Sequence, residues 1–224
     1  MVNKQDDRSR QRAREDYLKA IYHLGDGQPV KAVDLARHLR VSRASVSKLR
    51  RVLERDGLIT TARKRIEALR LTPEGLALAV RMVRRHRLVE TFLHRSLAVP
   101  LDRVHTDAEK IEHTISDDIA RRLAAFLGNP TSDPHGHLIP QSLSKRSAAH
   151  DAPLVAIAPG VAIVVSAVDD DDPKVMRKLV ALGVLPGLRA TVLAGPAHAV
   201  RLQSARQTIS LPRAAAASVR CRAA

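Results

Sequence analysis

Apolar residues recur at helical spacing in the first quarter of the chain and predict three short helices. The apolar positions fall within residues 17–24, 30–39 and 46–53, and each set is followed by glycine or polar residues. Ser42 precedes the third set and is predicted to be the N-cap of that helix. Two short helices joined by a tight turn, the second opening with Ser, Arg and Ser, are typical of a helix-turn-helix.

The next segment alternates in a strand-like way and then becomes helical again. Residues 58–71 predict two strands around a basic turn, which is the pattern of a wing. Pro73 stands at the first turn of a predicted long helix that continues to about Leu97. Two further helices are expected, one containing His105 to His113 and one beginning after Ser116.

Composition changes again in the last 100 residues. Pro, His, Ser and Gly dominate residues 128–153, where helical periodicity is lost. Short strands are predicted at 161–168, 190–193, 199–203 and 207–211, with a helical turn at 175–181, a spacing that suits a small SH3-like β-barrel. The expected fold is multi-domain α+β: a disordered basic arm (1–14), a winged helix-turn-helix (15–73), an all-α dimerisation and metal-binding domain (74–140), a linker (141–153) and the barrel (154–224).

The net charge of +15 is concentrated near the N-terminus. Residues 1–72 contain 18 Lys and Arg against 9 Asp and Glu, whereas residues 73–128 contain 9 against 8. Positive charge gathered in one module indicates a partner that carries phosphates. Because the chain has two Phe, two Tyr and no Trp, it offers few platforms for stacking bases, which favours duplex DNA over RNA.

The remaining composition limits the location and the chemistry. The longest apolar runs are too short to span a bilayer and the first residues are charged, so we expect a cytoplasmic protein with no membrane partner. Cys221 is the single cysteine and excludes both an internal disulfide framework and a cysteine-based zinc site. Any metal must therefore be held by His, Asp and Glu.

Four potential metal ligands share one face of the helix expected after Pro100. His105, Glu109, Glu112 and His113 fall within an arc of roughly 100° if the segment is helical. His86 and Glu90 form another pair, one helical turn apart, on the preceding helix. Imidazole and carboxylate donors together suit a divalent first-row metal. By contrast, His135 and His137 are expected to have structural roles only.

Several sequence blocks in the same order resemble the DtxR/MntR family of metal-dependent transcriptional repressors. The blocks are EDYLKAIYHL at 15–24, ERDGLI at 54–59, LTPEG at 71–75, RRHRLVETFL at 84–93, VHTDAEKIEHTISDDIARRL at 104–123 and DPHGHLIP at 133–140. RKLVALGVLPG at 177–187 is similar to the FeoA-like, SH3-type domain that many members carry. The resemblance covers nearly the whole chain and implies a homodimeric repressor that binds duplex DNA at an inverted repeat.

The resemblance implies two metal sites. One resembles the site of manganese-responsive members and would contain Asp16, Glu109, Glu112 and His113. The other would contain His86, Glu90 and His105, completed by an acidic residue of the SH3-like domain. Within the run Asp169 to Asp172, Asp172 is the candidate nearest to the family position.

The types of donor atom in these sites indicate which metal is preferred. The iron-responsive branch has softer, sulfur-containing residues at the positions of Asp16 and Glu109, so the oxygen donors favour Mn²⁺. Fe²⁺, Zn²⁺ or Co²⁺ could occupy the same ligands in vitro, and an iron-responsive repressor of uptake genes remains the alternative. Lys19 stands where two-domain manganese sensors have a second acid, which argues against a close metal pair.

The predicted DNA contacts lie at the start of the third helix and on the wing. They are Ser42, Arg43, Ala44, Ser45, Ser47, Lys48, Arg50, Arg51, Arg63, Lys64 and Arg65.

Two other functions compete with a metal-dependent repressor. A helical metalloenzyme would require a Glu-x-x-His pattern on two helices, which is absent, and would leave the helix-turn-helix unexplained. A winged-helix regulator of an organic ligand would leave the acidic residues merely solvated. We therefore expect a regulator and not an enzyme.

Overall fold

The computed structural model describes residues 4–25, 27–62, 68–141 and 151–224. The chain divides into two compact units, Met1–Arg85 with Pro140–Ser144, and His86–Ile139 with Lys145–Ala224, and only the described residues of each are considered below. The predicted wing turn, with Arg63, Lys64 and Arg65, lies outside the described residues, as does most of the predicted linker.

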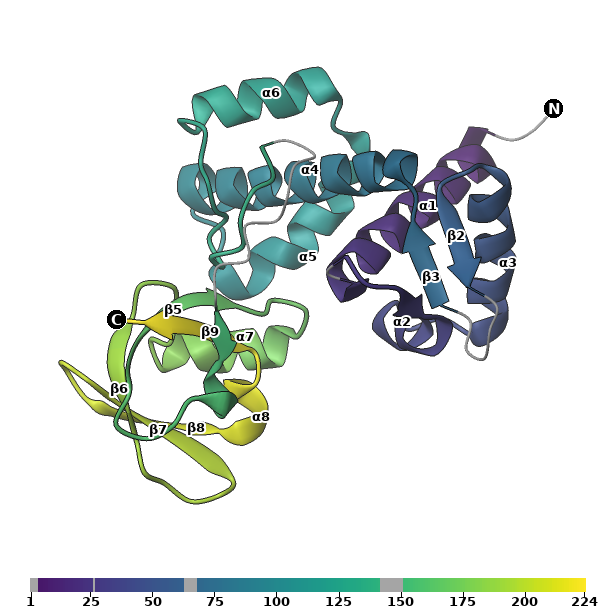
Figure 1. Cartoon of the computed structure of the whole chain (residues 1–224). Coiled ribbons are helices and arrows are strands. Elements are labelled where there is room, and N and C mark those ends of the chain that lie inside the picture. Colours follow the sequence, from purple (N-terminus) through teal and green to yellow (C-terminus); the bar gives the residue numbers. More distant parts are fainter. Residues whose placement is uncertain (1–3, 26, 63–67, 142–150) are drawn as a thin grey trace. The chain divides into compact units, whose positions relative to one another are not determined.

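The first unit combines helices with a small antiparallel sheet (Figure 1). Its elements are α1 (Lys4–Gly25), β1 (Val30–Lys31), α2 (Ala32–His38), α3 (Arg43–Arg55), β2 (Ile59–Ala62), β3 (Ala68–Leu71) and the first half of α4 (Pro73–Leu97), with sheet order β1-β3-β2. Leu18, Leu35, Leu53 and Leu69 are almost fully buried in its core. The structure thus confirms a helix-turn-helix followed by a two-stranded wing.

The start of α3 is fixed by its first residues. The Ser42 hydroxyl accepts a hydrogen bond from the Ser45 amide at 3.1 Å, which satisfies one of the unpaired donors at the helix terminus. Val46 and Leu53 are buried on one side of α3, and Arg43, Ser45 and Lys48 are exposed. The predicted N-cap is therefore correct, and the polar side of α3 is open to solvent.

Helix α1 begins at Lys4, so residues 4–14, predicted as a disordered arm, are helical. Charged side chains one turn apart support this extension: Arg10 lies near Asp6, and Gln11 donates a hydrogen bond to Glu15 at 3.0 Å. Asp6 and Asp7 also lie in the first turn, where they interact favourably with the helix dipole. The low apolar content of this segment predicted disorder, but the helix is stabilised by polar interactions that do not depend on apolar residues.

The helical part of the second unit contains the second half of α4, α5 (Leu101–Ile111), the 3₁₀ turn η1 (Glu112–Thr114) and α6 (Asp117–Phe126). Leu88 packs with Ala120, Ala124 and Ile139, whereas Val89 and Leu93 pack with Val104 and Ala108. Because α4 is buried on more than one side, it holds its polar residues in fixed positions between its neighbours. None of the helices within the described ranges is long and apolar enough to cross a membrane.

The rest of the second unit is a six-stranded antiparallel sheet, seen in green and yellow in Figure 1, with order β4-β9-β5-β6-β7-β8. Its elements are β4 (Ala152–Pro153), η2 (Leu154–Ala156), β5 (Ala162–Val168), α7 (Pro173–Ala181), β6 (Arg189–Leu193), β7 (Ala199–Ser204), β8 (Thr208–Pro212), α8 (Arg213–Ala216) and β9 (Val219–Ala223). The predicted barrel strands are present, and β4 and β9 are additional.

The α6 N-cap provides a test of local helix chemistry. The Ser116 hydroxyl accepts a hydrogen bond from the Ile119 amide at 3.2 Å. We expect Ser116→Ala to lower the free energy of unfolding by about 1 kcal/mol, because the amide loses its partner. Chemical denaturation would measure the change, and Ser116→Asp, which keeps an acceptor, should lose much less. Equal losses in the two variants would contradict a capping role.

Candidate metal centre

Three helical side chains and one barrel side chain converge in the second unit. His86 and Glu90 lie one turn apart on α4, His105 lies on α5, and Asp170 follows the end of β5. The Glu90 Oε1 atom is 2.9 Å from His86 Nε2 and 3.2 Å from His105 Nδ1. His105 Nδ1 is in turn 3.1 Å from Asp170 Oδ2, and one donor atom from each of the four residues lies within 4.8 Å of the others.

This cluster is buried and meets the requirements of a divalent cation. Glu90 is fully buried, and His86 and Asp170 are 6% and 9% exposed. Bonds of about 2.1 Å to a metal place neighbouring ligand atoms roughly 3 Å apart, as these donors are. Glu90 Oε2 has no hydrogen-bond partner within the described part of the chain, an unusual condition for a buried carboxylate. The residues present therefore fit a mixed nitrogen and oxygen metal site.

The charged groups of the cluster shift one another's pKa values. Burial alone would raise the pKa of Glu90, but the His86 charge and hydrogen bonds from His105 and His86 lower it to about 2. Burial would likewise lower the pKa of His105, yet its bonds to Asp170, Glu109 and Glu90 raise it well above the usual value. The cluster concentrates negative charge that protonated imidazoles or a divalent cation can balance.

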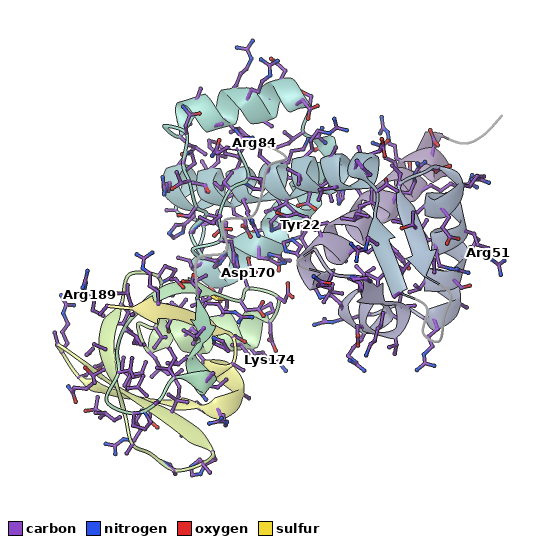
Figure 2. The ribbon with its side chains drawn as sticks, viewed as in Figure 1. Tyr22, Arg51, Arg84, Asp170, Lys174 and Arg189 are labelled. Carbon is purple, nitrogen blue, oxygen red and sulfur yellow. The ribbon has the colours of Figure 1, made fainter. Side chains whose placement is uncertain are left out.

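Asp170, and not Asp172, is the barrel residue in the cluster. Figure 2 shows Asp170 on the side of the barrel next to α5. Asp172 is the N-cap of α7, where its Oδ1 accepts a hydrogen bond from the Lys174 amide at 2.8 Å. The prediction of Asp172 is corrected on this geometry: within the aspartate run, Asp172 serves the helix start, while Asp170 faces His105.

His135 is a second neighbour that sequence reasoning assigned only a structural role. Its ring is fully buried, with Nε2 3.0 Å from the Leu101 carbonyl oxygen and Nδ1 3.1 Å from Asp170 Oδ2. Burial would lower the pKa of His135, but the hydrogen bond and charge of Asp170 raise it to about 9. Since Nε2–H donates to the Leu101 carbonyl, a hydrogen bond to the Asp170 carboxylate requires a second proton on Nδ1, so the ring in this contact is positively charged. In the sequence, the only indication of a role for His135 was its position in the DPHG segment at 133–136.

A tight turn brings His135 to the cluster. Asp133 Oδ1 accepts hydrogen bonds from the His135 and His137 amides, at 2.9 and 3.0 Å. Gly136 within this turn has φ +90°, and a Cβ there would lie 2.1 Å from the Ser166 carbonyl oxygen of β5. The turn can therefore approach the barrel only with glycine at this position.

Gly136→Ala is expected to push the turn away from β5 and to weaken the contact between His135 and Asp170. The added methyl group cannot fit beside Ser166 and favours a different φ, so a loss of about 2 kcal/mol or more of stability is expected. Denaturant titration would check the stability and isothermal titration with Mn²⁺ the metal affinity. Gly160→Ala is a control, because it shares a positive φ (+88°) but has open space around its Cβ. If both changes lowered the stability and the Mn²⁺ affinity equally, the close approach of Gly136 to Ser166 would not be the cause.

The other predicted ligands of the second unit lie at the end of α5. Glu112 is fully buried, and its Oε2 contacts His86 Nδ1 while its Oε1 is 3.5 Å from His113 Nε2. Glu109 is more open, with 47% of its side chain exposed, and its Oε1 is 3.6 Å from His105 Nε2. The two predicted ligand groups are therefore joined at two points: His86 contacts Glu90 on one side of its ring and Glu112 on the other, and His105 lies near Glu109.

Asp16, the remaining predicted ligand, lies on α1 in the first unit. Its side chain is 35% exposed, and its Oδ2 is 3.9 Å from Arg12 Nε. A single helical position does not distinguish a ligand from a solvated acid, so its assignment depends on the sequence resemblance.

The predicted DNA contacts of α3 are mostly exposed. Ser42, Arg43, Ala44, Ser45 and Lys48 are exposed at its start, and Arg51 extends from it to solvent (Figure 2). Ser47 is partly buried. The Arg50 side chain is only 12% exposed, and its guanidinium lies 3.6 Å from Glu54 Oε1 one turn along α3. Arg50 is therefore less accessible than Arg51.

The fold defines a DNA-binding protein in which a helical domain and a small barrel surround a candidate metal centre. Comparison with known proteins agrees in all three parts. Residues 11–66 match the family described as "Iron dependent repressor, N-terminal DNA binding domain", and residues 72–141 match "Iron dependent repressor, metal binding and dimerisation domain". Residues 152–223 match the FeoA domain. The chain belongs to the DtxR family of metal-dependent repressors.

Individual relatives match between about half and nearly all of the chain. The iron-dependent repressor IdeR of Mycobacterium leprae is 34% identical over 221 residues, which are 92% of this chain and 95% of the relative. The diphtheria toxin repressor of Corynebacterium diphtheriae is 37% identical over 128 residues, 56% of this chain and 55% of that protein. A solved manganese-dependent transcriptional repressor in complex with manganese is 32% identical with a TM-score of 0.85, covering 94% of this chain and 99% of its own.

Proposed function

We propose that this chain is a manganese-activated repressor that controls genes of metal-ion uptake. The observation that carries the proposal is the convergence of His86, Glu90, His105 and Asp170, none of which contributes sulfur. Oxygen and imidazole donors suit Mn²⁺, whereas thiolate or thioether donors would favour softer ions. Cys221, the single cysteine, is buried in the barrel core. The similar structure described as manganese-dependent supports the same choice.

Two groups of ligands are proposed in each subunit. The first is the cluster of His86, Glu90, His105 and Asp170. The second consists of Glu109, Glu112 and His113, completed by Asp16 on the basis of the sequence resemblance. A bound divalent cation would supply positive charge that the carboxylates of each group share. Glu112 then connects the groups, because it belongs to the second and contacts His86 of the first.

We propose that the metal-loaded dimer binds an inverted repeat through the exposed start of α3. Polar side chains and amides at a helix N-terminus suit phosphates and base edges, so Ser42, Arg43 and Ser45 are proposed to contact DNA together with Ala44, Ser47 and Lys48. Arg51 is proposed to bind phosphates, as are Arg50 and the wing residues Arg63, Lys64 and Arg65. Because Asp16 lies on α1 of the DNA-binding unit, its ligation would favour the DNA-competent conformation.

An iron-responsive repressor is the second candidate, supported by the iron-dependent relatives. To distinguish the two, chelator-treated protein would be titrated onto an operator selected from random duplexes, with Mn²⁺, Zn²⁺ or anaerobic Fe²⁺. We expect Mn²⁺ to activate binding, and Glu112→Ala to abolish activation. Asp107→Ala is the matched control, because Asp107 lies on α5 but pairs with Lys110 at 2.9 Å. Metal-independent binding by the wild type and Glu112→Ala would overturn the proposal; stronger activation by Fe²⁺ than by Mn²⁺ would favour iron.

A further inference from the structure

The C-terminal barrel has a strongly one-sided charge. Residues 173–224 contain nine Lys and Arg and no Asp or Glu. The four aspartates of the domain lie together at 169–172, where Asp170 faces the metal-binding cluster and Asp172 caps α7. None of the strand residues of the barrel is therefore acidic.

Strand pairing places arginines together on one face of the sheet. Val164 of β5 pairs with Arg189 of β6 on one side and with Arg222 of β9 on the other. Directly paired residues of antiparallel strands share a face, so both arginines lie on the side of Val164. Arg220 pairs with Ala167 beyond the β5 bulge. Arg201 of β7 pairs with Leu193 of β6. Leu193 and Arg189 are four residues apart on β6, so both face the same side of the sheet, and Arg201 lies on that side too.

These four residues, Arg189, Arg201, Arg220 and Arg222, are here called the arginine face. All four are exposed, and none has a hydrogen bond or ion pair with any residue that the structure describes. Other arginines of the same unit are paired: Arg121 lies 2.8 Å from Asp118, and Arg122 lies 2.9 Å from it. The arginine face thus presents uncompensated positive charge.

We propose that the arginine face binds the phosphate backbone of duplex DNA, as a contact separate from α3. Guanidinium groups bind phosphates through paired hydrogen bonds, and exposed unpaired arginines are available for this without breaking other interactions. Thr191 and Gln203 pair with each other on β6 and β7 and add polar donors to this side of the sheet. The chain carries a DNA-binding domain, so the polyanion it meets is duplex DNA. Phosphate contacts add affinity but little sequence discrimination.

The test compares two triple variants of the full-length, Mn²⁺-loaded chain. Arg189, Arg220 and Arg222 are replaced by Gln in one, and Lys174, Arg177 and Lys178 of α7 in the other, so each loses three charges from the same domain. Figure 2 shows Arg189 and Lys174 on different sides of the barrel. Binding to a random-sequence duplex of about 40 base pairs would be measured against salt concentration, and to the selected operator likewise. For the arginine variant, we expect the slope of log K against log salt to become shallower by about 0.9 per lost phosphate contact.

The α7 variant should keep the wild-type slope, and an Arg-to-Lys version of the arginine variant should keep most of it. The ratio of operator to random-duplex affinity should change little in the arginine variant. Equal loss in the two Gln variants would show a net-charge effect, and an unchanged slope would show that the face serves another partner such as an acidic protein. Either result would overturn the proposal. Loss of metal activation is measured separately, so failure of the manganese proposal would not affect this comparison.

Discussion

Asp170→Asn is expected to reduce Mn²⁺ affinity sharply, whereas Asp172→Asn should leave it nearly unchanged. Asp170 Oδ2 lies 3.1 Å from both His105 Nδ1 and His135 Nδ1, and its charge is part of the buried cluster. Asparagine keeps the shape but removes that charge, so the loss should exceed the roughly 10- to 100-fold typical of an outer-sphere partner. Isothermal titration of chelator-treated protein would measure the change.

Asp172→Asn is the matched control because the two aspartates share a turn and differ in what they contact. Asparagine is a good N-cap, so α7 should remain intact in this variant. Similar losses in both variants would mean that the run contributes general negative charge and that Asp170 has no special place. Normal Mn²⁺ affinity in Asp170→Asn would remove the barrel from the site.

The sequence was sufficient where the placement of a candidate ligand depends on helical periodicity alone. His86 and Glu90 are four residues apart on α4, so their common face follows from helix geometry whatever packs around them. The N-caps Ser42 and Ser116 were likewise predictable, because a cap depends on residues within one turn.

The parts that were not predictable depend on contacts between distant segments. Four consecutive aspartates look equivalent in sequence, and only the end of β5 and the start of α7 determine that Asp170 faces His105 while Asp172 caps a helix. Strand β9 is short and pairs with β5 more than 50 residues earlier, so its local pattern was too weak to predict it. The DPHG turn lies where the sequence shows no helical periodicity, yet its Asp133 hydrogen bonds and its fit against Ser166 bring His135 to the cluster.

The contact between His86 and Glu112 leads us to expect that the two proposed ligand groups influence each other. An imidazole that binds a cation through Nε2 donates its Nδ1–H to a neighbouring carboxylate, which fixes the ring and increases its basicity. Glu112 occupies that neighbouring position here. Its negative charge therefore supports the first group while its other oxygen faces His113 of the second group.

His86→Gln is accordingly expected to impair both ligand groups at once. The change removes the ring that contacts Glu90 and Glu112, leaving two fully buried carboxylates with fewer partners. We expect the number of tightly bound Mn²⁺ ions to fall and metal-activated operator binding to drop by at least about 100-fold. Electron paramagnetic resonance of free Mn²⁺ would count the bound ions, and fluorescence anisotropy would measure the operator affinity.

His94→Gln controls for loss of an imidazole from the same helix. His94 lies two turns further along α4, where its Nδ1 is 2.9 Å from the Val99 carbonyl oxygen. This variant should bind Mn²⁺ and operator like the wild type, and circular dichroism would verify that both variants remain helical. Glu90→Gln is the comparison variant, since Glu90 belongs to the first group and is connected to Glu112 through His86. If His86→Gln weakened Mn²⁺ binding no more broadly than Glu90→Gln, the link through His86 would have no functional role.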